Sequence, residues 1–214
     1  ILACNGAFAF LLEKGIRPAY MFCFEAHDMA LDFIKPVAGV RYLIASRCPP
    51  AAFDALKASD VVCWHAAGDN HIGDILDRRR VAEPMVTGGT AAVTRALNLV
   101  PSMGYKDIHI WGGDSSYKDG ATHARKGPAA ETPMRVMVNK RAFETSAWMA
   151  VQVEDFKTLA PMIVNTLGLG LHVHGDGLLP HVAMSMGCRT DIYPRVMQFA
   201  REWKWKARSL WQNL

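Results

Sequence analysis

Short apolar runs recur along the chain and alternate with longer segments whose apolar positions follow a helical period. Most of the runs have the length of a strand and are apolar on successive residues, which is typical of parallel strands covered on both faces. They lie at 1–4, 20–24, 41–45, 60–64, 85–87, 108–111, 134–139 and 169–174. The pattern predicts an α/β fold with a doubly wound, mostly parallel, Rossmann-like sheet of roughly six strands and helices on both faces.

Helices are expected between these runs. The predicted helical segments are 6–14, a short stretch ending at Ile34, a helix opened by Pro49-Pro50, 90–103, 145–167 with a kink or break at Pro161, and a helix that follows residues 174–181. The polar stretch 68–80 ends in Arg78, Arg79 and Arg80. Three consecutive arginines favour a solvated face, and the alternative is that they grip a phosphate.

The length and apolar content suit one domain. The chain has 214 residues, half of them hydrophobic, and we expect a single Rossmann-like domain over 1–214. Residues 195–214 predict a C-terminal amphipathic helix with Trp203 and Trp211 on its apolar stripe. That stripe can pack on the core or form a contact in a homo-oligomer, and contact with a membrane surface or nucleic acid is the remaining alternative.

Charge and cysteine content argue against several classes of protein. The net charge is +4, and residues 195–214, with five Arg/Lys and one Glu, account for all of it, so we expect no nucleic-acid partner. No apolar run approaches the roughly 18 residues of a membrane span, and no cleavable leader opens the chain. Five scattered cysteines without CxxC spacing predict buried thiols in a reducing compartment. We therefore expect a cytoplasmic protein.

Residues 84–117 predict a strand–turn–helix–strand unit. Gly88 and Gly89 form the turn, and Thr90 is expected to cap the helix. Free N–H groups and the helix dipole favour an anion there, with phosphate the natural candidate. No Lys-Ser/Thr pair follows the glycines and the spacing is not GxGxxG, so the turn is neither a Walker loop nor a dinucleotide fingerprint. The alternative is that the glycines only satisfy chain geometry.

Polar residues cluster just past the predicted strand ends. Ligands of doubly wound sheets bind outside the carboxyl ends of the strands, so we expect these residues to gather at one edge. They are Asn5, Glu25, His27, Asp28, His65, Gly88, Gly89, Thr90, Asp114, Ser115, Ser116, Tyr117, His174 and Asp176. In the phosphate hypothesis, Gly88, Gly89 and Thr90 bind the phosphate with help from Ser115 and Ser116.

A metal site is a second hypothesis. The order His172-Val-His174-Gly-Asp176 has the H-x-H-x-D opening of a metallo-hydrolase pattern. The next position, where that pattern places another histidine, is Gly177. We therefore expect no structural metal.

Acid–base catalysis is a third hypothesis. His174 or His181 would have an imidazole that titrates near neutrality, oriented by Asp176 or Asp114. His174 could deprotonate an attacking hydroxyl while Tyr117 hydrogen-bonds a departing phosphate oxygen. The predicted catalytic set is His174, Tyr117 and Asp114, with Glu25, Asp28, His65, His123 and Asp176 as secondary candidates.

Several motifs in order resemble one family. They are Ile1-Leu-Ala-Cys-Asn-Gly-Ala, Leu12-Glu-Lys-Gly-Ile-Arg-Pro18, Gly88-Gly89-Thr90, Arg95-Ala-Leu, Met103-Gly-Tyr-Lys-Asp-Ile-His-Ile-Trp-Gly-Gly-Asp-Ser-Ser-Tyr117 and His123. Together they resemble the 6-hydroxymethylpterin diphosphokinase MptE-like family, which includes motility-associated-factor proteins implicated in flagellin glycosylation and is distantly similar to bacterial sialyltransferases. The family normally has a Gly-Pro-Ser-Leu turn before the Cys-Asn strand, and we expect that turn and its strand to be missing here.

The resemblance implies a nucleotide-dependent transferase. The reaction would be glycosyl transfer from a nucleotide sugar of the CMP-nonulosonate kind, or diphosphate transfer from ATP, with Mg²⁺, to 6-hydroxymethyl-dihydropterin. Asn5 would contact the nucleotide, Gly88, Gly89 and Thr90 its phosphates, and 114–117 would line the pocket, with His174 as the base. The acceptor would be a small molecule or a glycan. The alternative is a non-catalytic nucleotide-binding or assembly domain.

Overall fold

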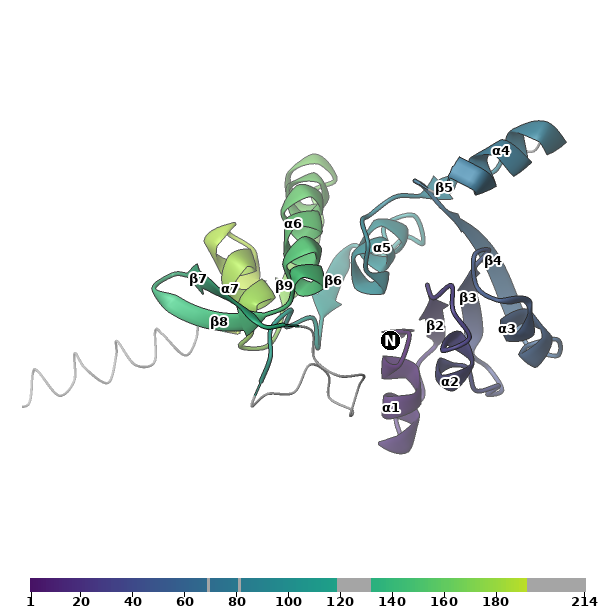
Figure 1. Cartoon of the computed structure of the whole chain (residues 1–214), viewed down its shortest axis with the longest axis horizontal. Coiled ribbons are helices and arrows are strands. Elements are labelled where there is room, and N and C mark those ends of the chain that lie inside the picture. The colour runs from purple at the N-terminus through teal and green to yellow at the C-terminus, as the bar shows by residue number, and fades with distance from the viewer. Residues whose placement is uncertain (69, 81, 119–131, 192–214) are drawn as a thin grey trace, which may run out of the picture. The chain divides into compact units, whose positions relative to one another are not determined.

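The computed structural model describes residues 1–68, 70–80, 82–118 and 132–191. The chain divides into two compact units, an N-terminal unit over Ile1–Met103 and a C-terminal unit over Gly104–Leu214 (Figure 1). The single domain over 1–214 stays a prediction. His123 and the predicted helix over 195–214 lie outside the described residues.

The N-terminal unit is built on a five-stranded parallel sheet. Its strands, in order across the sheet, are β1 (Leu2–Cys4), β2 (Tyr20–Cys23), β3 (Arg41–Ala45), β4 (Asp60–Ala66) and β5 (Met85–Val86). Each strand after β1 therefore pairs with the strand that precedes it in the sequence. The buried residues on successive positions of β2 and β3 fit strands covered on both faces.

Helices cover both faces of this sheet. Helices α1 (Ala7–Glu13), α2 (Ala30–Phe33) and α3 (Pro50–Ala55) contact one another in sequence, and Phe8 of α1 packs edge-on against Tyr42 of β3. On the opposite face, Phe22 stacks on Trp64, and Arg95 of α5 (Ala92–Leu99) lies over Phe24. The predicted α/β fold with a mostly parallel sheet and helices on both faces is confirmed.

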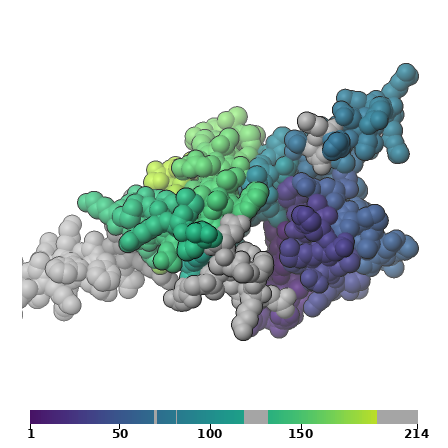
Figure 2. Space-filling view, viewed as in Figure 1, coloured from purple at the N-terminus to yellow at the C-terminus, as the bar shows by residue number. Residues whose placement is uncertain are grey.

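Helix α4 (Asn70–Arg79) lies at the periphery of the N-terminal unit (Figures 1 and 2). From the sequence this stretch was expected only to be polar, whereas the structure shows ten residues of regular helix. Arg78, Arg79 and Arg80 are exposed. The prediction that they form a solvated face is confirmed.

The C-terminal unit contains a second parallel sheet and a hairpin. The sheet has the order β10 (Arg189–Thr190), β9 (Gly170–Val173), β6 (Asp107–Ile110), and the antiparallel hairpin consists of β7 (Met134–Val138) and β8 (Arg141–Thr145). Strands β8 and β10 were not predicted. The hairpin turns at Asn139 and Lys140, both with positive φ, a conformation typical of a tight two-residue turn.

Three helical segments complete the C-terminal unit. Helix α6 (Ala147–Pro161) begins at Ser146, whose hydroxyl accepts a hydrogen bond from the Met149 N–H, and it passes into the π-helical segment η1 (Met162–Thr166). The predicted break at Pro161 is thus a change of helix type rather than an end. Helix α7 (Leu178–Ser185) follows β9. Within the described residues, no helix is both long enough and apolar enough to cross a bilayer.

All five cysteines are free thiols. Cys23, Cys48 and Cys188 are buried as predicted, but Cys63 is exposed on β4, which corrects the prediction for that residue. The Sγ atoms of Cys23 and Cys48 lie 3.8 Å apart. The hydrogen bond between them lowers the pKa of Cys48 to about 7, and the same bond together with burial raises the pKa of Cys23.

Candidate functional site

Asn5 joins the ends of two neighbouring strands. It has a positive φ of 45°, its backbone N–H donates to Phe22 O, and its side-chain Oδ1 accepts from the Phe24 N–H at 3.0 Å. The N-cap of α1 is Gly6, not Asn5. Its amide fixes the carboxyl edge of β1 and β2, where we predicted a nucleotide contact.

The Gly88 turn packs against the first turn of α5. Gly88 has φ of 120°, and a Cβ atom there would lie 2.7 Å from Thr94 O and 3.0 Å from Arg95 Cα. The helix begins at Ala92 with Ala91 as its N-cap, and no side chain caps it. The predicted cap by Thr90 is therefore wrong. The N–H groups at this helix start have no side-chain cap, which suits an anion.

Two arginines flank an aromatic ring at the same edge. The Arg95 guanidinium lies 4.7 Å from the centre of the Phe24 ring, and that of Arg47 lies 5.0 Å from it. Arg95 also donates to Val86 O at 2.6 Å and is mostly buried, whereas Arg47 is exposed. Sequence reasoning missed Arg47 and gave Arg95 no role. The signal for Arg47 was its place two residues past β3.

His65 lies inside β4, not past its end, and bridges two side chains. Its Nδ1 is 2.8 Å from Ser46 Oγ, and its Nε2 is 2.8 Å from Glu83 Oε2. Glu25 accepts hydrogen bonds from the backbone N–H and the ring of His27, and Asp28 is exposed. The structure thus gives His65 two polar partners that the sequence did not reveal.

In the C-terminal unit, the predicted segment 114–117 packs against the turn that opens α7. Asp114 O accepts from the Leu179 N–H, and a Cβ at Gly177 would lie 2.6 Å from Asp114 O. The Ser116 hydroxyl accepts from the Leu178 N–H at 3.2 Å. These two segments, which follow β6 and β9 respectively, therefore meet in the folded unit although they are far apart in the sequence.

The rest of this segment is anchored to β8 and its flanks. Ser115 has φ of 49°, its carbonyl accepts from the buried Thr145 hydroxyl at 2.8 Å, and its own hydroxyl lies 3.3 Å from Gln152 Oε1. The Tyr117 N–H donates to Glu144 O at 2.7 Å. The β8 strand, which the sequence did not predict, therefore fixes two of the predicted site residues.

His174 is oriented by Asp191, a residue that was not among the sequence candidates. Its Nδ1 lies 2.9 Å from both carboxylate oxygens of Asp191, its Nε2 lies 2.8 Å from His109 Nδ1, and its ring stacks on Trp111 at 3.7 Å. The expectation that Asp176 or Asp114 orients it is wrong. Asp176 instead forms a bidentate ion pair with Arg141, at 2.6 and 3.1 Å.

His181 is a buried residue of α7. Its Nδ1 lies 3.0 Å from Gly177 O, one turn earlier, and its ring packs against Phe143. The imidazole therefore ties the first turn of the helix to β8. These contacts support a structural role rather than the acid–base role that was the alternative to His174.

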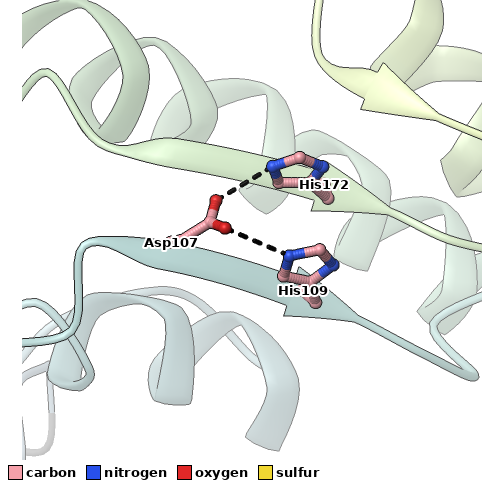
Figure 3. Close-up of side chains that lie close together, drawn as sticks. All are labelled: Asp107, His109 and His172. Atoms are coloured by element: carbon pink, nitrogen blue, oxygen red, sulfur yellow. Dashed lines mark hydrogen bonds and ion pairs between the residues drawn. The ribbon is translucent and has the colours of Figure 1, made fainter.

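A ladder of polar side chains lies on one face of the small sheet. Asp107 and His109 project from β6 and His172 from β9 (Figure 3). Asp107 Oδ2 lies 3.4 Å from His109 Nε2, and Asp107 Oδ1 lies 2.9 Å from His172 Nε2. The hydrogen bond from His109, with the charge of His172, lowers the pKa of Asp107. Of the H-x-H-x-D residues, His172 and His174 lie on the same face with ring centres 6.4 Å apart, whereas Asp176 pairs with Arg141.

The fold and the carboxyl edge of the N-terminal sheet define a Rossmann-like α/β protein with a turn suited to phosphate. The chain belongs to the 6-hydroxymethylpterin diphosphokinase MptE-like family, whose model matches residues 1–120. No curated protein and no solved structure matches the chain. Membership indicates a transferase or kinase-like function.

The predicted site residues belong to both units. Asn5, Glu25, Asp28, His65 and 88–90 lie in the N-terminal unit, whereas 114–117, His174 and Asp176 lie in the C-terminal unit. Their gathering at one common edge, and the roles assigned to them, stay predictions.

Proposed function

We propose that the protein is a nucleotide-dependent transferase that holds the phosphates of its nucleotide at the carboxyl edge of the N-terminal sheet. The observation that carries this proposal is the packing of the Gly88 turn on the start of α5, beside the guanidinium groups of Arg95 and Arg47. The family supports a transferase or kinase-like reaction.

The physical chemistry of this edge suits a phosphate group. A helix start without a side-chain cap offers backbone N–H groups and the positive end of the helix dipole. Guanidinium groups add charge-assisted, bidentate hydrogen bonds, which are roughly twice as strong as neutral ones. Arg47 is exposed beside the Phe24 ring, and that ring offers an apolar face. We propose that Asn5 contacts the nucleotide because its amide lies at the same strand ends.

Diphosphate transfer from ATP to the hydroxymethyl group of a pterin is the first candidate reaction, because the family's description names that reaction. Mg²⁺ would accompany ATP. Glycosyl transfer from a nucleotide sugar is the second candidate, because the resemblance to motility-associated-factor proteins implies it. Either reaction needs an acceptor hydroxyl that loses its proton.

A ligand panel tests the nucleotide and the edge together. The purified chain is tested by thermal shift and calorimetry with CMP, CDP, GDP, UDP, AMP and ATP, with and without Mg²⁺. Preference for ATP supports the diphosphokinase, and preference for CMP supports the glycosyl donor. Release of AMP from ATP in the presence of 6-hydroxymethyl-dihydropterin then tests turnover. Tight nucleotide binding without turnover of either kind would favour a non-catalytic binding domain.

Two arginines of β3 and its flank provide a matched pair of variants. Arg47 follows the carboxyl end of β3, whereas Arg41 begins the same strand and pairs with Asp60 at 2.7 Å. Arg47→Ala should weaken nucleotide binding by roughly 10- to 100-fold, the worth of a hydrogen bond to a charged group. Arg41→Ala should leave the affinity unchanged. Equal effects of the two variants would contradict a site at the carboxyl edge.

A further inference from the structure

The ladder on the open face of β6 and β9 holds three side chains that all bear metal-ligand atoms. His109 and His172 are register partners on the two parallel strands, and their rings stack with centres 4.2 Å apart. One carboxylate, that of Asp107, faces the Nε2 atoms of both rings (Figure 3). One ligand atom from each of the three residues lies within 4.8 Å of the others.

Gly170 makes room for this arrangement. It is the register partner of Asp107 on β9, and a Cβ atom at Gly170 would overlap Asp107 Oδ1. Its φ is not in the left-handed region, so the backbone does not require glycine there. The absence of a side chain lets the Asp107 carboxylate lean across the strand towards His172.

Hydrogen bonds orient the His109 ring beside the carboxylate. Asp191 can only accept, so the Nδ1 of His174 donates to it. The other nitrogen of His174, Nε2, lies 2.8 Å from His109 Nδ1 and shares one proton with it. His109 is thereby held with its Nε2 atom towards Asp107.

The Nε2 atom of His172 is buried and makes no hydrogen bond with any residue that the structure describes, although Asp107 Oδ1 is 2.9 Å away. Two ring nitrogens and a carboxylate therefore face one another, and one of the two nitrogens has no hydrogen-bond partner among the described residues. A cation among them would bind all three groups.

We propose that Asp107, His109 and His172 bind a first-row divalent cation of the zinc class through one carboxylate oxygen and two Nε2 atoms. Zinc takes imidazole and carboxylate ligands at about 2.0–2.2 Å, so the edges of its tetrahedron measure about 3.3–3.6 Å. The distance of 3.4 Å from Asp107 Oδ2 to His109 Nε2 matches such an edge, and the 2.9 Å from Asp107 Oδ1 to His172 Nε2 is shorter than one. Three ligands leave a coordination position for water.

His174 and Asp191 act as positioning residues for this site. A metal-bound histidine usually donates its other ring N–H to a partner that fixes the tautomer, and the His109 Nδ1–H donates to His174, which Asp191 holds in turn. Binding also requires the stacked rings to tilt towards the ion. His109, with 42% of its side chain exposed, has the freedom to do so.

This site is independent of the proposed nucleotide edge, which belongs to the N-terminal unit. The full, tag-free chain is stripped with EDTA and titrated with ZnCl₂ by calorimetry, and with CoCl₂ while the visible absorption of the cobalt ion is followed. We expect one equivalent of either ion and the intense absorption of tetrahedral cobalt. Failure to bind zinc would overturn the metal site and leave the nucleotide result untouched.

The zinc affinities of single variants distinguish the metal ligands from the residues that only lie near them. His109→Ala and His172→Ala should each weaken zinc binding by roughly 100-fold or more, and Gly170→Ala, which keeps every ligand, by roughly 10-fold. His174→Ala should weaken zinc binding by about 10- to 100-fold. His27→Ala, an exposed histidine of the N-terminal unit, is the control and should bind zinc as the parent does.

A second measurement guards against loss of fold. Urea unfolding in EDTA should give similar midpoints for the parent and for Gly170→Ala. Added zinc should raise the midpoint of the parent by more than that of Gly170→Ala, because a ligand that binds only the folded state stabilises that state in proportion to its affinity. Zinc affinity that is unchanged in both His109→Ala and His172→Ala would overturn the proposal. So would an unfolding midpoint of the parent that does not respond to zinc.

Discussion

Gly88→Ala probes the turn on which the proposed phosphate site depends. Two separate penalties act on an alanine at this position. The backbone φ of 120° lies where side chains are strained, and the new Cβ would meet Thr94 O at 2.7 Å and Arg95 Cα at 3.0 Å. Both contacts are to backbone atoms of α5, so no flexible side chain can move aside. The turn or the helix start must shift instead.

The magnitude follows from adding the two penalties. An unfavourable backbone conformation costs about 1–3 kcal/mol, and forcing extra volume into a packed site costs about 1–3 kcal/mol more. The free energy of unfolding should therefore fall by about 2–6 kcal/mol. Gly15→Ala isolates the first penalty, because Gly15 has φ of 73° and a Cβ added there would meet no atom within 4 Å. That variant should cost only about 1–2 kcal/mol.

The assay is urea unfolding of the parent and both variants, followed by nucleotide titration of whichever proteins remain folded. Gly88→Ala should bind the preferred nucleotide more weakly than Gly15→Ala, since the shift displaces the uncapped start of α5. If the two variants lose equal stability and keep equal affinity, the close packing of the Gly88 turn on α5 is wrong. The phosphate assignment would then lose its geometric basis.

Three further outcomes follow from buried contacts. Tyr42→Phe should cost about 1–3 kcal/mol of unfolding free energy, because the tyrosine hydroxyl makes two hydrogen bonds of 2.7 Å to backbone groups of the α2–β3 loop. Thr145→Val should also lower the unfolding free energy by about 1–3 kcal/mol, because the Ser115 carbonyl loses its buried hydrogen-bond donor. The urea midpoints of the two variants measure both losses. The pKa of Cys48 is lowered from 9.0 to about 7 beside Cys23, so the stability this thiol contributes is present above pH 9 and lost as pH falls through 7. The urea midpoint of the parent, compared with that of Cys48→Ala, should thus rise between pH 7 and 9. If the midpoints of the two proteins change with pH in the same way, the lowered pKa of Cys48 is wrong.

Much of the fold was predictable because local pattern decides it. The apolar runs 20–24 and 41–45 became β2 and β3, and Pro161 marked a real change in helix type. The hairpin was missed because residues 141–144 were assigned to no element and Thr145, the last residue of β8, was placed in the predicted helix, whereas α6 begins only after the Ser146 cap. A serine cap and the Asn139-Lys140 turn were the available signals.

The candidate site was harder because its contacts depend on strand order. The alternation of Asp107, Ile108, His109 and Ile110 could have shown a half-exposed strand with polar residues on one face. Nothing local shows that β6 lies beside β9, which sets His109 against His172. For the same reason, the sequence assigned Asp176 to His174, whereas the neighbouring strand β10 brings Asp191 to it.

The two sheets differ in the length of chain that must form a loop before their strands can pair. In the N-terminal sheet the paired residues are close in sequence: Tyr20 pairs with Arg41, and Arg41 pairs with Asp60. In the other sheet His109 pairs with His172, a sequence separation roughly three times as long. Because the entropic cost of closing a loop grows with the logarithm of its length, this longer loop costs about 1 kcal/mol more to close. Pairing between strands close in sequence speeds folding, so the strands of the N-terminal unit should pair in the order in which they are synthesised. Strand β6 should pair only after β9 has been synthesised.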